Sequence, residues 1–348
     1  MKATYAQAEY GKVILKTKEL QKPGPGQLLL EAEVSSMSPG TEHSLMAGLV
    51  LPLPQCIGYS MVASVVEVGE GVTDFKAGDL VVATGGHASH LILDERICTP
   101  APKDIDKEQA AFFNLAHTAL YGVRRANIQL GEPVVVFGQG VVGLLAAQLS
   151  RLAGATPLIV TDIDDKRLEY SKEMGAHYAI NTKNQPDELK DVIRDLGLGG
   201  VPVVIEATGV REPLELAFEI VGERGRVVML STVLKDGGVP QYDVNLFEKG
   251  AVLIGCFVNS KPFSLKRNDL TIKVEWPPVP IDESRRYVSS DIWTSDEDIR
   301  VFLSLIKFGS LDIKPLITHR FSVDQIPEAY ELVWNKDPGL LGGLIHWK

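Results

Sequence analysis

A glycine-rich turn is the segment of this sequence that most directly predicts chemistry. The run Gly138-Gln139-Gly140-Val141-Val142-Gly143 follows an apolar stretch and opens a segment with helical periodicity. In turns of this type the first glycine permits a tight bend, the second lets the backbone approach a pyrophosphate, and the third lets helix and strand pack closely. Asp162 ends the next apolar stretch, about 20 residues further on, where a carboxylate can accept hydrogen bonds from ribose hydroxyls. The sequence therefore predicts a dinucleotide site.

The charge at Asp162 also bears on the choice of dinucleotide. A carboxylate at this position would repel a 2′-phosphate, and Asp164 and Asp165 add negative charge nearby. We therefore expect NAD rather than NADP. The alternative is a glycine-rich turn that binds nothing, with Asp162 a solvated strand end.

Six short apolar stretches, separated for the most part by helical segments, surround this turn. The stretches are 134–137, 158–161, 178–180, 203–206, 227–230 and 252–255, and the helical segments are 142–153, 166–174 and 213–221. Alternation of this kind predicts a parallel sheet with crossover helices. The expected fold class is α/β, with a doubly wound Rossmann sheet.

The first hundred residues differ in texture. Short β-branched stretches at 13–15, 28–30, 62–69 and 80–83 are broken by glycine and proline, which predicts a β-rich, partly barrel-like domain. Residues 109–127 then carry helical periodicity with few breakers, so we expect a helix there that contains a domain boundary. A further helix is expected at 296–308, before a final β-rich piece.

Composition and charge exclude several classes of protein. The 348 residues carry a formal net charge of −10 without a run of five or more like charges, whereas nucleic-acid partners are bound by clustered Lys and Arg. No apolar stretch approaches the roughly 18 residues that span a bilayer, and no signal segment is visible. We therefore expect a cytoplasmic protein without nucleic-acid or membrane partners. The three cysteines form no CxxC pair, which argues against a disulfide framework or a cysteine-rich zinc lobe.

With these patterns in place, the chain resembles the medium-chain dehydrogenase/reductase superfamily, the relatives of zinc alcohol and polyol dehydrogenases, over essentially its full length. The motifs that carry the resemblance are 66–72, 77–81, 138–143 with Asp162, 175–176, 206–209 and 316–319. The resemblance implies a GroES-like β-rich catalytic domain at 1–120, a Rossmann NAD-binding domain at 121–258, and an insertion with the rest of the catalytic domain at 259–348. It also implies an active site in the cleft between the domains and a homodimer or homotetramer.

The resemblance extends the predicted cofactor site beyond the glycine-rich turn. Val141 and Val142 would border the cofactor, and Thr208 would lie near the pyrophosphate or the nicotinamide. Arg167 and Ala207 are assigned to the same site.

The positions that hold zinc in many relatives have other residues here. Those relatives carry Cys-Gly-Thr-Asp at the first ligand, where this chain has Pro39-Gly40-Thr41-Glu42, and Gly-His-Glu at the second, where it has Gly58-Tyr59-Ser60. The third ligand position aligns near Asn114. Because these residues ligate zinc poorly or not at all, we expect no metal. A different centre built from His43, His87, His90 and His117 stays open as an alternative, although none forms an i,i+4 pair with a helpful carboxylate.

Without a Lewis acid, hydrogen-bond donors must stabilise the reacting carbonyl oxygen, and some group must carry the proton. Tyr59 lies at the former second-ligand position, and its phenol can donate or, with a lowered pKa, act as a base. Thr41 falls where zinc-dependent relatives keep a relay hydroxyl, and His43 lies one position short of their relay histidine. With Asn114, these are the predicted catalytic residues. Two alternatives stay open: Tyr59 only fills vacated volume while Glu42 caps a local turn, and His43 lies at the surface.

The stretch 259–295 is longer than in relatives and rich in aromatic residues and proline, so it either shapes a substrate pocket or forms a subunit contact. We expect an NAD-dependent, zinc-independent dehydrogenase that interconverts a secondary hydroxyl and a ketone on a small polyol, sugar or related alcohol. The patterns at 38–42 and 58–60 also resemble a zinc-free subgroup that includes tetrapyrrole-side-chain alcohol dehydrogenases, so a larger substrate remains open. The alternatives are a zinc-free enone or quinone reductase, which would usually prefer NADPH, and a non-catalytic NAD(H)-binding redox sensor.

Overall fold

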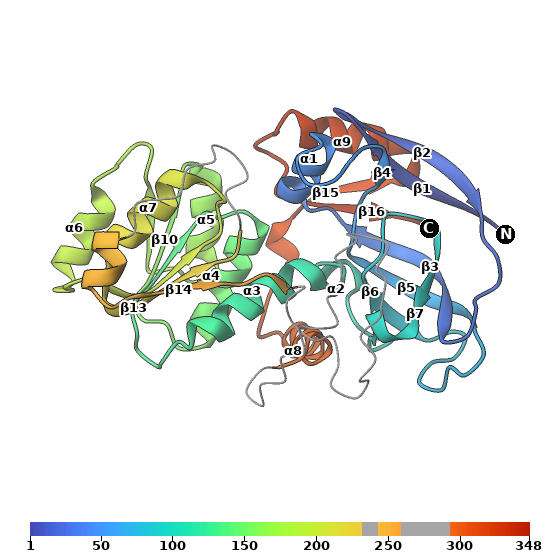
Figure 1. The fold of residues 1–348 in the computed structure, drawn as a ribbon, viewed down its shortest axis with the longest axis horizontal. Coiled ribbons are helices and arrows are strands. Elements are labelled where there is room, and N and C mark those ends of the chain that lie inside the picture. Colours follow the sequence, from blue (N-terminus) through green and yellow to red (C-terminus); the bar gives the residue numbers. More distant parts are fainter. Residues whose placement is uncertain (232–242, 259–292) are drawn as a thin grey trace. The chain divides into compact units, whose positions relative to one another are not determined.

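The computed structural model describes residues 1–231, 243–258 and 293–348. The chain divides into two compact units, with Met1–Leu115 and Lys261–Lys348 in unit 1 and Ala116–Ser260 in unit 2 (Figure 1). Most of the stretch 259–295, for which we expect a pocket-shaping or subunit role, lies outside the described residues.

Unit 2 is built on a six-stranded, fully parallel sheet (Figure 1). Its strand order is β11-β10-β9-β12-β13-β14, the doubly wound order, so the predicted Rossmann sheet is confirmed. The strands are β9 (Val134–Phe137), β10 (Leu158–Asp162), β11 (Tyr178–Asn181), β12 (Val201–Glu206), β13 (Val221–Met229) and β14 (Val252–Gly255). The helices are α4 (Val141–Leu152), α5 (Asp165–Glu173), α6 (Glu188–Asp195) and α7 (Arg211–Ile220).

Burial explains why apolar runs without alternation form these strands. Every residue of β9 and β10 is buried, the pattern of strands covered on both faces. The chain winds outward in opposite directions from β9 and from β12, so the topological switch point lies between these two strands. Ligands of such sheets bind at the carboxyl ends of the strands at this point.

Unit 1 contains two sheets. A three-stranded sheet has the order β2-β1-β4, and a seven-stranded sheet has the order β15-β16-β3-β5-β6-β8 with β7 paired to β3. The strands are β1 (Lys2–Glu9), β2 (Lys12–Glu19), β3 (Gln27–Ser36), β4 (Gln55–Cys56), β5 (Met61–Val68), β6 (Leu80–Ala83), β7 (His90–Asp94), β8 (Cys98–Pro100), β15 (Ile317–Ser322) and β16 (Gly342–His346). The β-rich, GroES-like character expected for the first hundred residues is confirmed, and the last strands of the chain complete the same sheet.

Two helices from opposite ends of the chain pack on each other in unit 1. They are α1 (Pro39–Met46) and α9 (Ile326–Trp334), and they share a buried core that includes Met46, Ile57 and Ala329 (Figure 1). A third helix, α8 (Ser295–Lys307), begins with a capping box in which Thr294 and Glu297 satisfy each other's backbone N–H groups. The packing of α1 on α9 joins α1 to the C-terminal segment.

The helix expected over 109–127 is interrupted. The structure has α2 (Lys107–Ala110) and α3 (Phe113–Ala126), with a turn at Ala111. The reason is tertiary: the buried hydroxyls of Ser36 and Ser60 donate to the Ala111 carbonyl oxygen at 2.8 and 2.6 Å. Side-chain donors that take a backbone carbonyl compete with helical hydrogen bonding, and periodicity does not reveal them.

Within the described residues, no helix is long and apolar enough to cross a membrane.

Candidate active site and cofactor loop

The three glycines of the turn after β9 meet different surroundings. Gly138 has φ +83°, and a Cβ there would lie 2.7 Å from Cγ2 of Thr208. A Cβ on Gly143 would lie 1.7 Å from the Gly138 carbonyl oxygen, whereas one on Gly140 would meet nothing within 4 Å. The first and third glycines are therefore required by the turn and by helix packing, and the second leaves open space at the start of α4.

Asp162 lies at the carboxyl end of β10 and is 9 % exposed. Its Oδ2 accepts from the backbone N of Gln139 at 2.5 Å, and its Oδ1 accepts from the backbone N of Ile163 and Asp164 at 2.8 and 3.0 Å. A carboxylate offers about four lone-pair sites, so one on Oδ2 remains for a ligand hydroxyl. The structure brings Asp162 to the glycine-rich turn, as the spacing predicts.

Gln139, in the glycine-rich turn, and Arg167, on α5, are two further residues predicted at the cofactor site. The buried Gln139 side chain donates to the Val136 and Gly138 carbonyls at 3.1 and 3.0 Å and accepts from Ser171 at 3.0 Å. Gln139 therefore braces the turn with its side chain. The Nε of Arg167 is buried and has no hydrogen-bond partner among the described residues.

Glu206 lies at the carboxyl end of β12, beside the glycine-rich turn. Its carboxylate accepts from the Thr208 backbone N at 2.6 Å, from the Thr208 hydroxyl, and from Ser231 Oγ at 3.1 Å. Burial raises the pKa of Glu206, and the hydrogen bonds from Thr208 and Ser231 oppose that rise. This network holds Thr208 against Gly138, and Ala207 packs near Gly143. Sequence reasoning did not single out Glu206, although it stands in a recognised motif.

In unit 1, Tyr59 is held from two directions. The Asn114 amide Nδ2 donates to the Tyr59 carbonyl oxygen at 2.9 Å and to Thr84 Oγ1 at 3.3 Å. The phenol hydrogen-bonds with the side chains of Ser38 and Thr41, at the beginning of α1. Tyr59, Thr41 and Asn114 are thus brought together, and Asn114 acts on the Tyr59 backbone.

The surroundings of Tyr59 raise the pKa of its phenol. Burial raises its pKa to about 12; the Ser38 hydroxyl lowers it, the Glu42 charge raises it, and the Thr41 hydroxyl lowers it, in decreasing order of effect. The phenol is therefore protonated at neutral pH. Of the two roles that the sequence leaves open for Tyr59, the structure favours the hydrogen-bond donor over the base.

The ring of His43 packs on α9. It is half-buried and stacks on the indole of Trp334, with ring centroids 5.4 Å apart and an interplanar angle of 21°. Thr41 is exposed, although its hydroxyl bonds the Tyr59 phenol. The ring of His43 therefore makes a packing contact with α9, and the catalytic and surface roles considered for His43 stay predictions.

Glu42 does not cap a turn, which corrects the alternative stated for it. Its side chain is fully buried, its Oε2 accepts from the Tyr330 hydroxyl at 3.0 Å, and its Oε1 lies 3.4 Å from Nε2 of buried His87. Sequence reasoning missed Tyr330, because 288 residues separate it from Glu42. His87 was considered only as a metal ligand. Among the described residues, no group of three or more His, Cys, Asp or Glu side chains is arranged to hold a metal ion.

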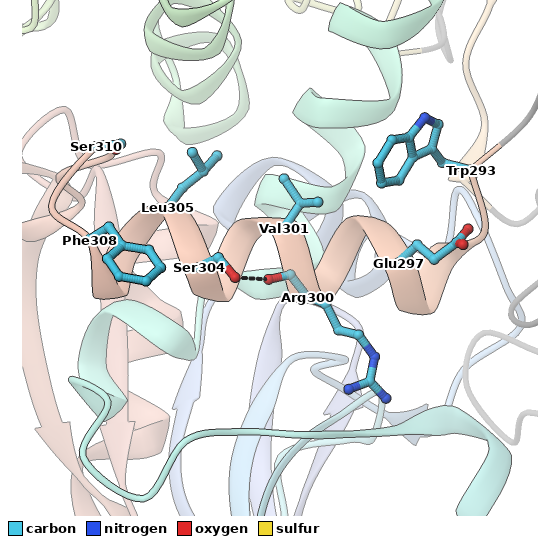
Figure 2. Close-up of a pocket in the computed structure, with 8 residues that line it drawn as sticks. All are labelled: Trp293, Glu297, Arg300, Val301, Ser304, Leu305, Phe308 and Ser310. Atoms are coloured by element: carbon cyan, nitrogen blue, oxygen red, sulfur yellow. Dashed lines mark hydrogen bonds between the residues drawn. The ribbon is translucent and has the colours of Figure 1, made fainter.

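A separate apolar cavity of about 360 Å³ lies along α8 (Figure 2). Val301 and Leu305 point to the same side of the helix, and Trp293 and Phe308 contribute aromatic surface. None of the predicted site residues lines it. The cavity is therefore distinct from the Tyr59 group and from the glycine-rich turn.

Comparison with known proteins agrees with this geometry. Residues 24–103 match the family model of the alcohol dehydrogenase GroES-like domain, and residues 141–271 match that of the zinc-binding dehydrogenases. The L-threonine 3-dehydrogenase of Shewanella baltica is 27 % identical over 333 residues, covering 85 % of this chain and 84 % of that protein.

Solved structures share the fold over almost the whole chain. A candidate zinc-binding dehydrogenase from Sinorhizobium meliloti, bound to NADP, has a TM-score of 0.79 at 22 % identity. An alcohol dehydrogenase from Escherichia coli CFT073, complexed with NADH, has a TM-score of 0.80 at 17 % identity. Each comparison covers 99 % of both chains. The chain belongs to the medium-chain dehydrogenase/reductase superfamily, the oxidoreductases of the alcohol dehydrogenase type.

The close approach at Gly143 gives a stability prediction. Gly143→Ala should lower the free energy of unfolding of unit 2 by about 2 kcal/mol, because the added methyl group cannot avoid the Gly138 carbonyl. Gly140→Ala is the matched control and should cost less than about 1 kcal/mol, the scale of a changed helix cap. Urea unfolding followed by circular dichroism measures both. Equal stability of the two variants would contradict the packing described for this turn.

Proposed function

We propose that this protein is an NAD(H)-dependent dehydrogenase that interconverts a secondary alcohol and a ketone without a catalytic metal. One observation carries the proposal: the Tyr59 phenol lies beside the Ser38 and Thr41 hydroxyls in surroundings that raise its pKa and so disfavour the phenolate. A neutral phenol can donate a hydrogen bond to a carbonyl oxygen as negative charge develops there. The substrate class expected from the resemblance is a polyol, a sugar or a related alcohol.

The chain offers a fitting site for a dinucleotide. The beginning of α4 has no side-chain cap, so its backbone N–H groups are free of side-chain acceptors, and the space next to Gly140 is open. Helix beginnings of this kind bind phosphate groups through N–H donors and the helix dipole. Gly138, Gly140, Val141 and Thr208 would surround the pyrophosphate and the nicotinamide end.

Asp162 and its neighbours favour NAD over NADP. The remaining lone pair on Asp162 Oδ2 suits a ribose hydroxyl, whereas a 2′-phosphate would add negative charge next to a buried carboxylate. Arg167, on α5, is a further residue that we expect at this site. The preference rests on this chain's own residues, because its structural relatives include one bound to NADP and one complexed with NADH.

The side chains at the positions that correspond to the zinc ligands of many relatives do not fit zinc. Proline at position 39 has no donor atom, and the raised pKa of Tyr59 disfavours a phenolate ligand. Ser60 donates to the Ala111 carbonyl at 2.6 Å, and the Asn114 amide donates to Tyr59 and Thr84. Zinc prefers thiolate, imidazole and carboxylate ligands, and none of these four residues supplies one. We therefore derive no step through a metal.

Tyr59, Thr41 and Asn114 have separate roles in the proposed carbonyl reduction. The nicotinamide, when bound, supplies the hydride. Tyr59 would orient the carbonyl oxygen and donate its proton as the alkoxide forms, since a phenol is a stronger acid than an alcohol. Thr41 bonds the phenol and is exposed, so it links Tyr59 to solvent for reprotonation. Asn114 holds the Tyr59 backbone in place.

Cofactor affinity tests the cofactor part of the proposal. Wild-type protein should bind NADH at least about tenfold more tightly than NADPH, which corresponds to roughly 1.4 kcal/mol. Asp162→Asn should weaken NADH binding and reduce this preference, because the charge that repels the 2′-phosphate is lost. Titration of each nucleotide by fluorescence gives the dissociation constants.

Asp195→Asn is the control for this titration, since Asp195 is an exposed carboxylate of unit 2 at the end of α6. It should leave the ratio unchanged. A wild-type preference for NADPH would contradict the NAD assignment and would support a zinc-free enone or quinone reductase.

Turnover tests the role of Tyr59. Wild-type protein is assayed for NADH formation with L-threonine, 2,3-butanediol and sorbitol, and for NADH oxidation with 2-cyclohexenone and a benzoquinone. In the reverse direction, with NADH and the ketone of whichever alcohol is oxidised, Tyr59→Phe should lower kcat about 100- to 1000-fold, the usual effect of removing one donor to a developing oxyanion. The dissociation constant for NADH should stay unchanged.

Tyr10→Phe provides the matched control, because Tyr10 lies in unit 1 and is 72 % exposed. It should keep wild-type turnover. Undiminished turnover in Tyr59→Phe would refute the donor role, and turnover of only the enone or the quinone would refute the alcohol assignment. NADH binding without turnover of any compound would favour a redox sensor.

A further inference from the structure

Glu206 lies in the middle of the carboxyl edge of the parallel sheet in unit 2. It is the last residue of β12, in register with Phe137 at the end of β9 and with Met229 at the end of β13. Its side chain is fully buried, although β12 is the neighbour of the strand that leads into the glycine-rich turn. A buried carboxylate is costly unless hydrogen-bond donors compensate its charge. The donors around Glu206 therefore show what this side chain holds in place.

Three donors from two loops converge on the Glu206 carboxylate. The Thr208 backbone N donates to Oε1 at 2.6 Å, the Thr208 hydroxyl donates to the same oxygen, and Ser231 Oγ donates to Oε2 at 3.1 Å. The Val210 backbone N can only donate, and it donates to Thr208 Oγ1 at 3.0 Å, so the hydroxyl hydrogen of Thr208 is left for Glu206. One side chain thereby joins the loop after β12 to the loop after β13.

The loop after β12 lies directly against the glycine-rich turn. A Cβ on Gly138 would lie 2.7 Å from Thr208 Cγ2, and one on Gly143 would lie 3.6 Å from Ala207 Cβ. The Ala207 backbone N donates to the carbonyl oxygen of Phe137, the residue before the turn, at 3.0 Å. Residues 207–209 are only half-buried, so the loop keeps an accessible face beside the turn.

The strand order assigns this loop to one half of a dinucleotide. Asp162 ends β10, the glycine-rich turn follows β9, and Glu206 ends β12, and the three strands are neighbours in the order β10-β9-β12. In the proposed function the adenosine ribose lies at Asp162 and the pyrophosphate at the beginning of α4. A dinucleotide that begins at β10 and crosses the end of β9 continues over β12, toward β13. The two loops joined by Glu206 therefore lie where the nicotinamide half arrives.

We infer that Glu206 is a positioning residue for the nicotinamide half of the cofactor, and that its hydrogen bonds to Thr208 and Ser231 hold the loops after β12 and β13 in the arrangement that this half binds. The inference rests on the proposed function, in which the dinucleotide lies on the glycine-rich turn. Glu206 acts through Thr208, because its own side chain is fully buried. Without the carboxylate both Thr208 donors lose their acceptor, and the loop must be ordered at the expense of binding.

Binding of NADH and of AMP tests the inference, because AMP contains only the adenosine half of the cofactor. In Glu206→Ala the dissociation constant for NADH should rise about tenfold, the scale of ordering a few side chains, while that for AMP stays within about twofold of the wild type. Asp162→Asn, at the adenosine end, should weaken binding of both compounds. Fluorescence titration gives the constant for NADH, and isothermal titration calorimetry gives that for AMP.

Glu206→Gln separates the hydrogen bonds of Glu206 from its charge. The glutamine oxygen can still accept from Thr208, and the amide can donate to the Ser231 hydroxyl, which can also accept; this variant should bind NADH within about threefold of the wild type. Equal weakening in Glu206→Gln and Glu206→Ala would overturn the inference. Glu223→Ala is the matched control, because Glu223 is an exposed carboxylate on β13, and both of its constants should equal those of the wild type.

Circular dichroism confirms that each variant is folded. If Glu206→Ala does not fold, Ser231→Ala takes its place, because it removes one of the three donors and leaves Glu206 bound to Thr208. This variant should weaken NADH binding about threefold, the scale of one hydrogen bond, and leave AMP binding unchanged. Wild-type affinity for NADH in the folded variant, or equal weakening of NADH and AMP, overturns the inference.

The same measurements separate this inference from the proposed function. A protein in which Glu206→Ala weakens NADH but not AMP, and which oxidises no alcohol, would refute the proposed function and leave the role of Glu206 standing. A protein that oxidises an alcohol, but whose Glu206→Ala variant binds NADH like the wild type, would refute the inference alone. Wild-type protein that binds no NADH would refute both.

Discussion

The contact between Glu42 and Tyr330 constrains the candidate site in unit 1 more than any other interaction. It joins α1 to α9 across 288 residues of sequence, inside a core where neither side chain meets water. A carboxylate at that depth needs both the phenolic donor and the His87 ring nearby. Because α1 also carries the Ser38 and Thr41 hydroxyls, the same contact sets the direction from which Tyr59 is hydrogen-bonded. The C-terminal segment thereby takes part in shaping a group of residues near the N-terminus.

In unit 2, contacts of backbone groups form most of the candidate cofactor site. Gly143 lets α4 approach the end of β9, and Asp162 receives three backbone N–H groups that fix the turn and its neighbours. Glu206 orders Thr208 on the other side of the switch point. The turn is therefore held by contacts within the chain itself, which reduces the ordering cost of binding.

The sequence predicts unit 2 better than the candidate active site, for a physical reason. Strands β9 to β14 and the glycine-rich turn are encoded by neighbouring residues, in the apolar runs and in the spacing to Asp162. The break between α2 and α3 depends on hydroxyls from β3 and from the residue before β5, which no local pattern reveals. Partners such as Tyr330 for Glu42, and Trp334 for His43, come from a helix near the other end of the chain. Residue types at family-like positions located Tyr59, but only the three-dimensional surroundings show which groups raise and lower the pKa of its phenol.

The proposed function requires the Tyr59 phenol to act at a position where zinc-dependent relatives hold a metal. Zinc content together with turnover tests this requirement most directly. Protein purified without added metal and dialysed against a chelator is analysed for zinc by mass spectrometry, and then assayed for NADH formation with and without added zinc. The account predicts far less than one zinc per chain and the same rate in both assays. Stoichiometric zinc that survives purification, or a rate that appears only when zinc is returned, would contradict it.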